Sequence, residues 1–348
     1  MSTVEWEGNA ATYEDEEEKK VLLGALSSFF QYAKVAHFNT THLRRQSFYA
    51  MPRAHWEMLA QPPFSYLETL DAVDEAIDKN SELAVAILHA GLQSFGLSKV
   101  AAADAGGKAD WRGVATSNDV EKARSTLRQF YRDWSEEGRS EREACYGPVI
   151  KALRDERSSR SESKLRVLVP GAGLGRLVFE LCCAGFDAEG NEISATLSAI
   201  QTAGQMSMSA SDFLLLYGDE EQKDSFDAVA TVFFLDTAPN IIRYIEVIRN
   251  CLRAGGLLVN VGPLLWHFEN NAPGTHGREK EHSSHQDDSG IADPGSVELT
   301  DDEVVALVGK LGFDVLYQSP GIEAPYIQDK QSMLQNTYIA SHWVARKR

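Results

Sequence analysis

The chain contains the sequence Val167-Leu-Val-Pro-Gly-Ala-Gly-Leu-Gly-Arg-Leu177, in which a short β-branched run stops at three closely spaced glycines. An amphipathic run follows, so the pattern predicts a strand, a tight turn and a helix. Glycine permits a positive φ in the turn, and because it has no Cβ it lets a ligand approach the backbone. The same pattern occurs where open α/β sheets bind nucleotide-like ligands.

An acidic residue stands where a ribose would need it. Gly190-Asn-Glu192 comes where a second parallel strand should end, and a carboxylate there can accept hydrogen bonds from both ribose hydroxyls. The third glycine, Gly175, comes one residue earlier than the dinucleotide pattern G-x-G-x-x-G requires. This spacing favours S-adenosylmethionine, which has no pyrophosphate to place on the helix N-terminus. An NAD oxidoreductase and a glycine turn without a ligand are the weaker alternatives.

Two further residues fit an adenosine site. Asp212 and Phe213 follow a predicted third strand. A carboxylate at this point can accept a hydrogen bond from the adenine amino group, and a neighbouring apolar side chain can cover the ring. The alternative is an ordinary turn at the end of a strand.

The alternation of strands and helices after Leu165 predicts a doubly wound α/β sheet. We expect strands near 166–170, 186–191, 206–210, 226–234, 256–262, 313–318 and 336–345, and helices near 174–184, 194–202, 239–252 and 301–311. Residues 1–100 have helical periodicity, 101–118 suggest a linker, and 119–164 suggest a helical or helix-turn-helix segment. The α/β domain then covers 165–348 and includes a polar, mobile loop at 271–296.

The amino-acid composition limits the classes of partner and ligand that we expect for this chain. The net charge of −17, from 34 basic and 51 acidic residues, disfavours nucleic acid and an anionic membrane. The four cysteines lack metal-ligand spacing, and the polar loop gives no order to His276, His282 and His285, so we expect free thiols and no metal site. The N-terminal sequence lacks the features of a signal peptide. We expect a small-molecule substrate and a cytosolic protein, with the nucleus as a second compartment, and we leave a homodimer open.

An acid and a base are expected side by side at the sheet edge. Asp236 follows the predicted fourth strand, and His267 follows the fifth. Ligands of open α/β sheets bind beyond the carboxyl ends of the strands, so both residues should lie near a group held by the glycine loop. Such a pair can orient a nucleophile. His267 alone would more often be a structural loop histidine.

From about residue 15 to its end, the chain resembles the carnosine N-methyltransferase family. The specific blocks are Arg124-Ser-Thr-Leu-Arg-Gln-Phe-Tyr-Arg-Asp-Trp134, Glu141-Arg-Glu-Ala-Cys-Tyr146, Phe233-Phe-Leu-Asp-Thr-Ala238, Gly262-Pro-Leu-Leu-Trp-His-Phe-Glu-Asn270 and Ser296-Val-Glu-Leu-Thr300, beside the glycine loop and Gly190-Asn-Glu192. The resemblance implies a seven-stranded, Rossmann-like methyltransferase domain preceded by a helical region. It also implies methyl transfer from S-adenosylmethionine to the imidazole of a histidine-containing dipeptide, giving anserine from carnosine.

The resemblance assigns roles to individual residues. It implies that the cofactor is bound by Gln129, Arg132, Gly171, Gly173, Glu192, Asp212 and Phe213. An arginine fork suits the carboxylate of the methionine end. It implies that the substrate is bound by Asp236, His267, Tyr326 and Tyr338, with Asp236 and His267 catalytic. A carboxylate that accepts the N–H of one imidazole nitrogen leaves the lone pair of the other nitrogen available for attack.

The chain departs from the family between Glu192 and Asp212. The family normally has a much longer segment there, whereas this chain has only 193–211. The missing part would form a helix and a wall of the adenine and substrate pockets. One alternative to the dipeptide reaction is therefore a catalytically impaired cofactor-binding protein. Another is a methyltransferase of the same fold that acts on free or protein histidine, because Asp236 and His267 would serve any imidazole.

Overall fold

The computed structural model describes residues 16–94, 112–160, 164–192, 206–268, 290–292, 295–319 and 321–348. Its internal contacts divide the chain into two units, Met1–Gln129 and Phe130–Arg348. The boundary falls inside one helix, α5 (Ser117–Trp134). The boundaries suggested from the sequence at 100, 118 and 164 stay predictions, and residues 101–111 of the expected linker lie outside the described part.

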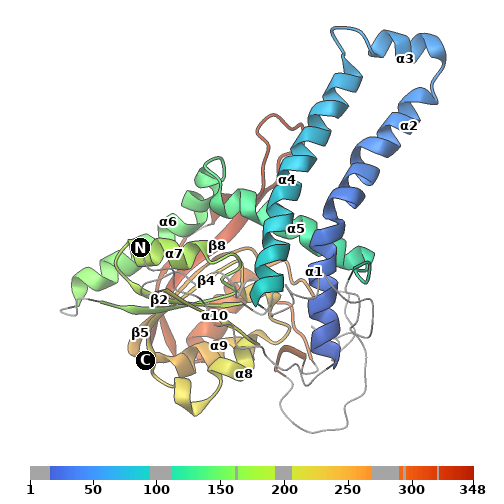
Figure 1. Cartoon of the computed structure of the whole chain (residues 1–348). Helices are drawn as coiled ribbons and strands as arrows, with labels where there is room; N and C mark the ends of the chain where they lie inside the picture. Colours follow the sequence, from blue (N-terminus) through green and yellow to red (C-terminus); the bar gives the residue numbers. More distant parts are fainter. Residues whose placement is uncertain are drawn as a thin grey trace, which may run out of the picture. The chain divides into compact units, whose positions relative to one another are not determined.

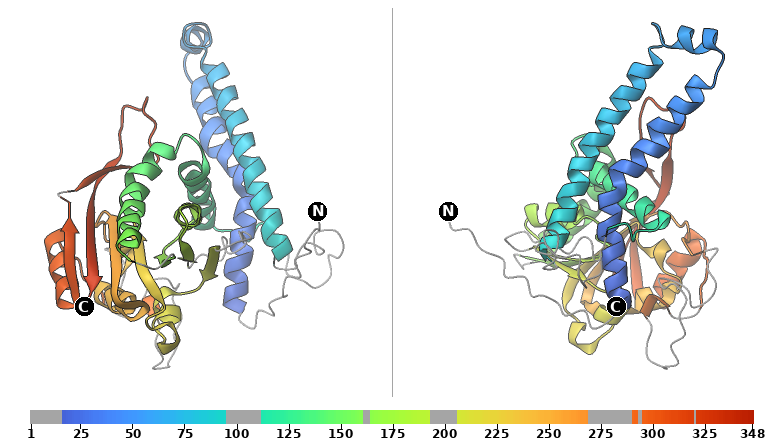
Figure 2. Two further views of the ribbon diagram at one scale, coloured as in Figure 1. Left: turned by 90° about the vertical axis from the view of Figure 1, so that its left-hand side faces the viewer. Right: turned by 45° about the vertical axis from the view of Figure 1, so that its right-hand side comes forward.

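The first unit is helical, as expected. A long hairpin is formed by α1 (Glu16–His37) and α4 (Tyr66–Ser94), which pack side by side (Figures 1 and 2). A π-helical turn (Phe38–His42), α2 (Leu43–Tyr49) and α3 (Arg53–Leu59) complete its tip. The core of this unit consists of apolar side chains at helical spacing, namely Leu22, Leu26, Phe29, Tyr32, Ala84, Leu88, Leu92, Ala123 and Leu127.

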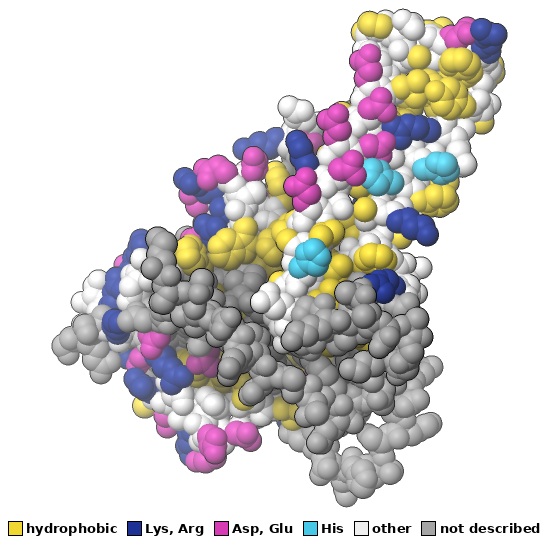
Figure 3. All heavy atoms as spheres, in the orientation of Figure 1, with side chains coloured by type: hydrophobic (Ala, Val, Ile, Leu, Met, Phe, Trp, Pro, Cys, Tyr) yellow, Lys and Arg dark blue, Asp and Glu magenta, His cyan; other side chains and the backbone are white. Residues whose placement is uncertain are grey.

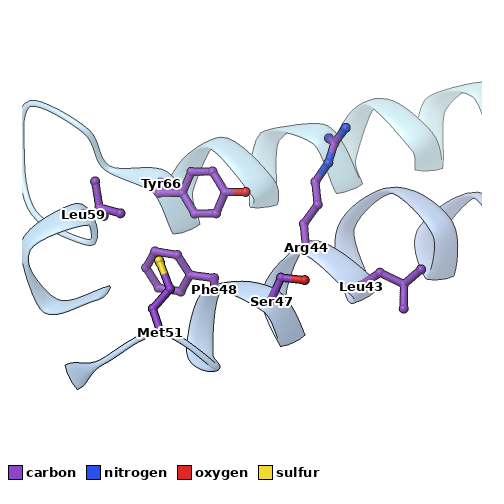
Figure 4. Close-up of a pocket in the computed structure, with 7 residues that line it drawn as sticks. All are labelled: Leu43, Arg44, Ser47, Phe48, Met51, Leu59 and Tyr66. Atoms are coloured by element: carbon purple, nitrogen blue, oxygen red, sulfur yellow. The ribbon is translucent and has the colours of Figure 1, made fainter. Parts of the chain in front are cut away.

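The tip of the hairpin carries exposed apolar side chains, which gather on the face shown in Figure 3. A hollow there is lined by Leu43, Arg44, Ser47, Phe48, Met51, Leu59 and Tyr66 (Figure 4). The ring of Tyr66 stacks on Phe48 at 5.0 Å between centroids. None of the predicted site residues is among those that line this hollow.

Below the tip, charged side chains join the helices. His37 bonds to two carboxylates of α4, from Nδ1 to Asp74 at 2.7 Å and from Nε2 to Asp78 at 2.9 Å. Both ring nitrogens can donate only when the imidazole is protonated. The hydrogen bonds to Asp74 and Asp78 raise the pKa of His37. Burial raises the pKa of Asp74, but hydrogen bonds from Thr41, His37 and Arg45 outweigh it and bring it to about 2.

The second unit contains a mixed sheet with the order β3-β2-β1-β4-β5-β8-β6. The strands are β1 (Arg166–Pro170), β2 (Asp187–Glu192), β3 (Met206–Ala210), β4 (Phe226–Val232), β5 (Leu252–Gly262), β6 (Phe313–Gln318), β7 (Ile322–Pro325) and β8 (Thr337–Lys347). The first five are parallel, and β8 runs antiparallel to β5, β6 and β7. The seven predicted strands are confirmed. The short β7 was not predicted, because four residues ending in proline resemble a loop.

Helices cover both faces of the sheet, so the prediction of a doubly wound fold is confirmed (Figure 1). On one face the core contains residues of α6 (Arg139–Ser159) and α7 (Arg176–Cys183). On the other it contains residues of α8 (Phe213–Tyr217), α9 (Ile241–Cys251) and α10 (Asp301–Lys310). The predicted helix at 194–202 and the loop residues 271–289 lie outside the described residues.

Three further findings concern the described part of the chain. All four cysteines are free thiols. No group of three or more metal-ligating side chains is found there, although His276, His282 and His285 fall outside it. Within the same residues, no helix combines the length and the apolar character that crossing a membrane requires.

Candidate active site

The glycine loop joins β1 to α7 and takes the backbone conformation that its sequence demands. Gly171, Gly173 and Gly175 have φ values of 63°, 52° and 73°. A Cβ on Gly171 would come within 2.5 Å of the Phe234 ring, whereas a Cβ on Gly173 would meet nothing within 4 Å. The loop is therefore packed on its inner side and open at Gly173, where a ligand can reach the backbone.

Glu192 lies against this loop. It is the last residue of β2, and its Oε2 accepts a hydrogen bond from the Gly173 N–H at 2.9 Å. Since β1 and β2 are parallel neighbours in register, the carboxyl end of β2 arrives beside the loop that follows β1. The structure thus brings together the loop and the carboxylate that the sequence predicted for a ribose.

A small cavity of about 50 Å³ lies beside the loop. Gly171 and Gly173 line it together with side chains from α6, the end of β4 and the end of β7. The open glycine backbone and the nearby Glu192 carboxylate together fit the nucleoside part of an adenosyl cofactor.

Arg132 reaches this cavity from the last turn of α5. Its Nε and Nη2 donate to the Asp133 carboxylate at 2.6 and 3.2 Å, and its guanidinium lies 4.9 Å from the Tyr326 ring centroid. Burial lowers the pKa of Arg132, but the charge of Asp133 and the hydrogen bonds to it raise the pKa overall, so the guanidinium stays charged. Nη1 has no hydrogen-bond partner within the described ranges, and it can donate to an anionic ligand.

The end of α5 is fixed to the glycine loop by Trp134, whose Nε1–H donates to the Leu174 carbonyl at 3.2 Å. Gln129 precedes Arg132 by three positions on the same helix and is half-buried. It belongs to the other unit of the chain, and its expected cofactor contact stays a prediction.

Asp212 and Phe213 are engaged elsewhere. Asp212 caps α8 by accepting the Leu214 N–H at 2.8 Å, and its second oxygen accepts the Ile291 N–H at 2.9 Å. Phe213 is 5% exposed, and its ring packs 5.4 Å from that of Phe234 in the core. Neither residue lines the cavity at the glycine loop. Their adenine contacts stay predictions, and the structure gives both residues a local structural role as well.

Asp236 and His267 lie together at the ends of β4 and β5, as expected. The Asp236 Oδ2 is 3.7 Å from the His267 Nε2 and accepts the Leu265 N–H at 3.1 Å. The backbone repeats the pairing, because the His267 N–H donates to the Asp236 carbonyl at 3.3 Å. Asp236 is 1% exposed, while the His267 side chain is 61% exposed.

The second carboxylate oxygen of Asp236, Oδ1, is buried and has no hydrogen-bond partner in the described part of the chain. Burial raises the pKa of Asp236, and this effect outweighs the Leu265 hydrogen bond and the nearby His267. An unpaired buried acceptor costs free energy, so native structures rarely keep one without a reason. A ligand that donates an N–H to Oδ1 would remove that cost.

Tyr326 and Tyr338 meet at a third aromatic ring, that of Phe233. The three centroids are 5.7 to 5.9 Å apart, within the range of favourable aromatic pairs. Phe233 has a φ of 53°, and it lines the cavity with Tyr326. Strained backbone at a non-glycine residue is often found at functional sites. Sequence reasoning did not propose Phe233 for the site, although it stands at the carboxyl end of β4, three residues before Asp236.

Comparison with known proteins gives consistent matches. A family model described as carnosine N-methyltransferase matches residues 109–198 and 194–348. The chain is 34% identical over 382 residues to the carnosine N-methyltransferase of Schizosaccharomyces pombe, covering 95% of this chain and 97% of that protein. It is 30% identical over 386 residues to the Mus musculus protein of the same name, covering 97% and 88%. Among solved structures, magnesium protoporphyrin IX methyltransferase from Synechocystis PCC 6803 with bound SAM is 14% identical, with 64% of this chain and 90% of that chain covered at a TM-score of 0.41.

Proposed function

This chain belongs to the carnosine N-methyltransferase family, and on that basis we propose that it transfers a methyl group from S-adenosylmethionine to an imidazole nitrogen of carnosine or a related histidine-containing dipeptide. It is thus an S-adenosylmethionine-dependent N-methyltransferase. The substrate is the small molecule that the relatives' names indicate, and the residue roles given below are our proposals.

The observation that carries the proposal is the unpaired Oδ1 of Asp236. A neutral imidazole has one N–H and one nitrogen with a free lone pair, and only the latter can attack a methyl group. A buried carboxylate that accepts the N–H selects the tautomer with the lone pair on the other nitrogen. As the methyl group is transferred the ring becomes cationic, and the same carboxylate stabilises this charge in a site of low dielectric.

His267 and the aromatic rings complete the substrate side. The Nε2 of His267 lies 3.7 Å from the Asp236 Oδ2, which is beyond hydrogen-bond distance, and we propose that His267 orients the carboxylate or the substrate ring when the substrate is bound. Tyr326 lines the cavity and Tyr338 packs edge-on against the Tyr326 ring, and aromatic rings of this kind suit an imidazole ring or its cation. We assign substrate binding to these four residues, with Asp236 and His267 catalytic.

The residues around the glycine loop fit the cofactor. S-adenosylmethionine, when bound, supplies an electrophilic methyl group on a sulfonium. We propose that Glu192 accepts the ribose hydroxyls, that Gly171 and Gly173 admit the nucleoside to the backbone, and that Arg132 binds the methionine carboxylate. Gln129, Asp212 and Phe213 are proposed as the remaining contacts.

Two alternatives follow from the same residues. Asp236 and His267 would serve any imidazole, including free histidine or a protein histidine. A cofactor-binding protein without turnover is the second, because the chain has only residues 193–211 where the family normally has a much longer segment, and the two family matches meet at 194–198.

The test is a methyl-transfer assay with purified full-length protein, S-adenosylmethionine and carnosine, followed by mass detection of the product. Methylcarnosine would support the proposal. Product from free histidine or a histidine peptide, with none from carnosine, would favour the first alternative. Cofactor binding by calorimetry without methylation of any imidazole would favour the second.

We keep a homodimer, a cytosolic location and a second, nuclear location as further proposals. Light scattering of the purified protein tests the first, and a mass equal to 38.4 kDa would exclude it under those conditions. Fractionation of cells that produce the protein tests the other two.

A further inference from the structure

A buried carboxylate beside the cavity holds a distant turn of the chain. Glu141, in the first turn of α6, is 6% exposed. Its Oε2 accepts the N–H of Ile327 at 2.7 Å, and its Oε1 accepts the N–H of Gln328 at 2.8 Å. These partners are 186 and 187 positions away in the chain. Two short, charge-assisted bonds from one side chain to successive backbone N–H groups form a rigid clamp.

The clamped turn is strained. Ile327 has a φ of 49°, a conformation that β-branched residues strongly disfavour. The flanks of the turn are tied to the start of β8, since the Tyr326 N–H donates to the Asn336 carbonyl at 3.2 Å and the Gln328 Nε2 donates to the Thr337 hydroxyl at 2.8 Å. Strained conformations persist only where several contacts determine them together. Glu141 supplies the hydrogen bonds to the backbone N–H groups of the strained residue and of its neighbour, Gln328.

The turn carries Tyr326, which lies in the wall of the cavity. The Tyr326 ring is contacted from one side by the Arg132 guanidinium at 4.9 Å and from another by Phe233 at 5.8 Å between centroids. Glu141 and Tyr326 both line the cavity, and Ile327 directly follows Tyr326 in the chain. A shift of the turn would therefore move the tyrosine ring.

We propose that Glu141 is a positioning residue that holds Tyr326 in place at the substrate end of the cavity. The proposal rests on the proposed function for the identity of the substrate and for the assignment of Tyr326 to the substrate. Both carboxylate oxygens of Glu141 already accept backbone N–H groups, so Glu141 acts through Tyr326 rather than on the reacting atoms. Sequence spacing could not show this, because the two segments meet only in the folded chain.

Glu141→Gln is the informative change. A glutamine side chain can accept one of the two N–H groups, but its amide NH₂ then faces the other, and a donor against a donor cannot bond. We expect the KM for carnosine to rise about tenfold while kcat changes less than about twofold, because lost positioning weakens binding without removing the attacking geometry. Glu143→Gln is the matched control: Glu143 is exposed on the same helix, and its KM should stay at the wild-type value.

A double-mutant cycle separates positioning from a general loss of stability. If Glu141 acts through Tyr326, then Glu141→Gln adds no further rise in KM when Tyr326 is already alanine. Independent, additive effects of the two changes on KM would overturn the proposal. Equal effects of Glu141→Gln and Glu143→Gln would overturn it as well.

Hydrogen exchange of the wild-type protein tests the clamp without any variant and without turnover. The amides of Ile327 and Gln328 should exchange much more slowly than those of exposed turns, since both are bonded to a buried carboxylate. Exchange at the rate of an open turn would overturn the proposal even if Glu141→Gln failed to fold. If the wild-type protein methylates no imidazole while these amides are protected, the proposed function fails and the clamp stands.

Discussion

Replacing Asp236 by asparagine tests the core of the proposed mechanism. The change is nearly isosteric, and the asparagine carbonyl can still accept the Leu265 N–H that Asp236 Oδ2 accepts at 3.1 Å. The amide NH₂ then takes the place of Oδ1, the oxygen without a partner among the described residues. A donor thus replaces the acceptor that we assign to the imidazole N–H.

The expected loss follows from these contacts. A hydrogen bond to a charged group contributes about 1.5–3 kcal/mol, and a polar group left unpaired in a buried site costs about 1–3 kcal/mol more. Combining the two contributions, we expect a loss of about 3–5 kcal/mol in transition-state stabilisation, which corresponds to a fall of roughly 150- to 5,000-fold in kcat/KM. The Kd for S-adenosylmethionine should stay within about twofold of the wild-type value, because a contact made only to the imidazole does not contribute to cofactor binding.

Unlike the activity, the folding stability of the Asp236→Asn variant should not fall at pH 7. Since burial raises the pKa of Asp236 above 3.8, the folded state disfavours the ionised form, and the wild type loses stability as the pH rises through that interval. The neutral Asp236→Asn variant escapes this loss, so its Tm should equal or exceed that of the wild type at pH 7, with a smaller difference near pH 4. Differential scanning calorimetry at both pH values measures this.

The control is Asp227→Asn. Asp227 is buried, but both of its oxygens have partners, the Arg166 N–H at 2.8 Å and the Arg253 guanidinium at 2.8 Å. The Asp227→Asn change should lower the Tm and leave kcat per folded molecule unchanged. If Asp236→Asn instead lowers the Tm by several degrees and abolishes cofactor binding, or if it keeps more than about a third of the wild-type kcat/KM, then Asp236 is structural and the mechanism is wrong.

Three other changes test the cofactor site and the helical unit. Glu192→Gln should raise the Kd for S-adenosylmethionine by about 10- to 150-fold, as the loss of a charged hydrogen bond of about 1.5–3 kcal/mol requires, and unchanged affinity in calorimetry would move the ribose site elsewhere. Gly173→Ala should lower the free energy of unfolding by about 1–2 kcal/mol, because only the positive φ opposes a side chain there. Gly171→Ala should lower it more, because the added Cβ would lie 2.5 Å from a phenyl ring. Urea titrations measure both changes. Because the pKa of His37 is raised, its contribution to folding stability is full below about pH 6.5 and is lost as the pH rises through the raised pKa. The Tm of His37→Ala should therefore lie below that of the wild type at pH 5.5, and this difference should shrink by pH 9. A difference that does not change with pH would rule out the charged pair with Asp74.

The sequence alone was sufficient where the chemistry is local or where parallel strands impose a common edge. The glycine spacing predicted the turn after β1, and the positive φ of each glycine confirms it. The end of β2 carries Glu192 to Gly173, and the ends of β4 and β5 carry Asp236 to His267, because neighbouring parallel strands finish on the same side of a sheet. Periodicity likewise predicted the seven longer strands and both faces of helices.

Other features depended on contacts that no local pattern contains. Asp212, which stays proposed for the adenine, also accepts the N–H of Ile291, which comes 79 positions later. The strained Phe233 and the clamp from Glu141 to Ile327 also arise only when distant segments pack together. Hydrogen bonds within a helix, a turn or a pair of strands depend on neighbouring residues, so sequence determines them directly. The side chains at the cavity come from segments that are distant in the sequence. Which buried donors and acceptors find partners, and which are left free for a ligand, is settled only when the sheet and its helices have packed, so only the tertiary structure decides it.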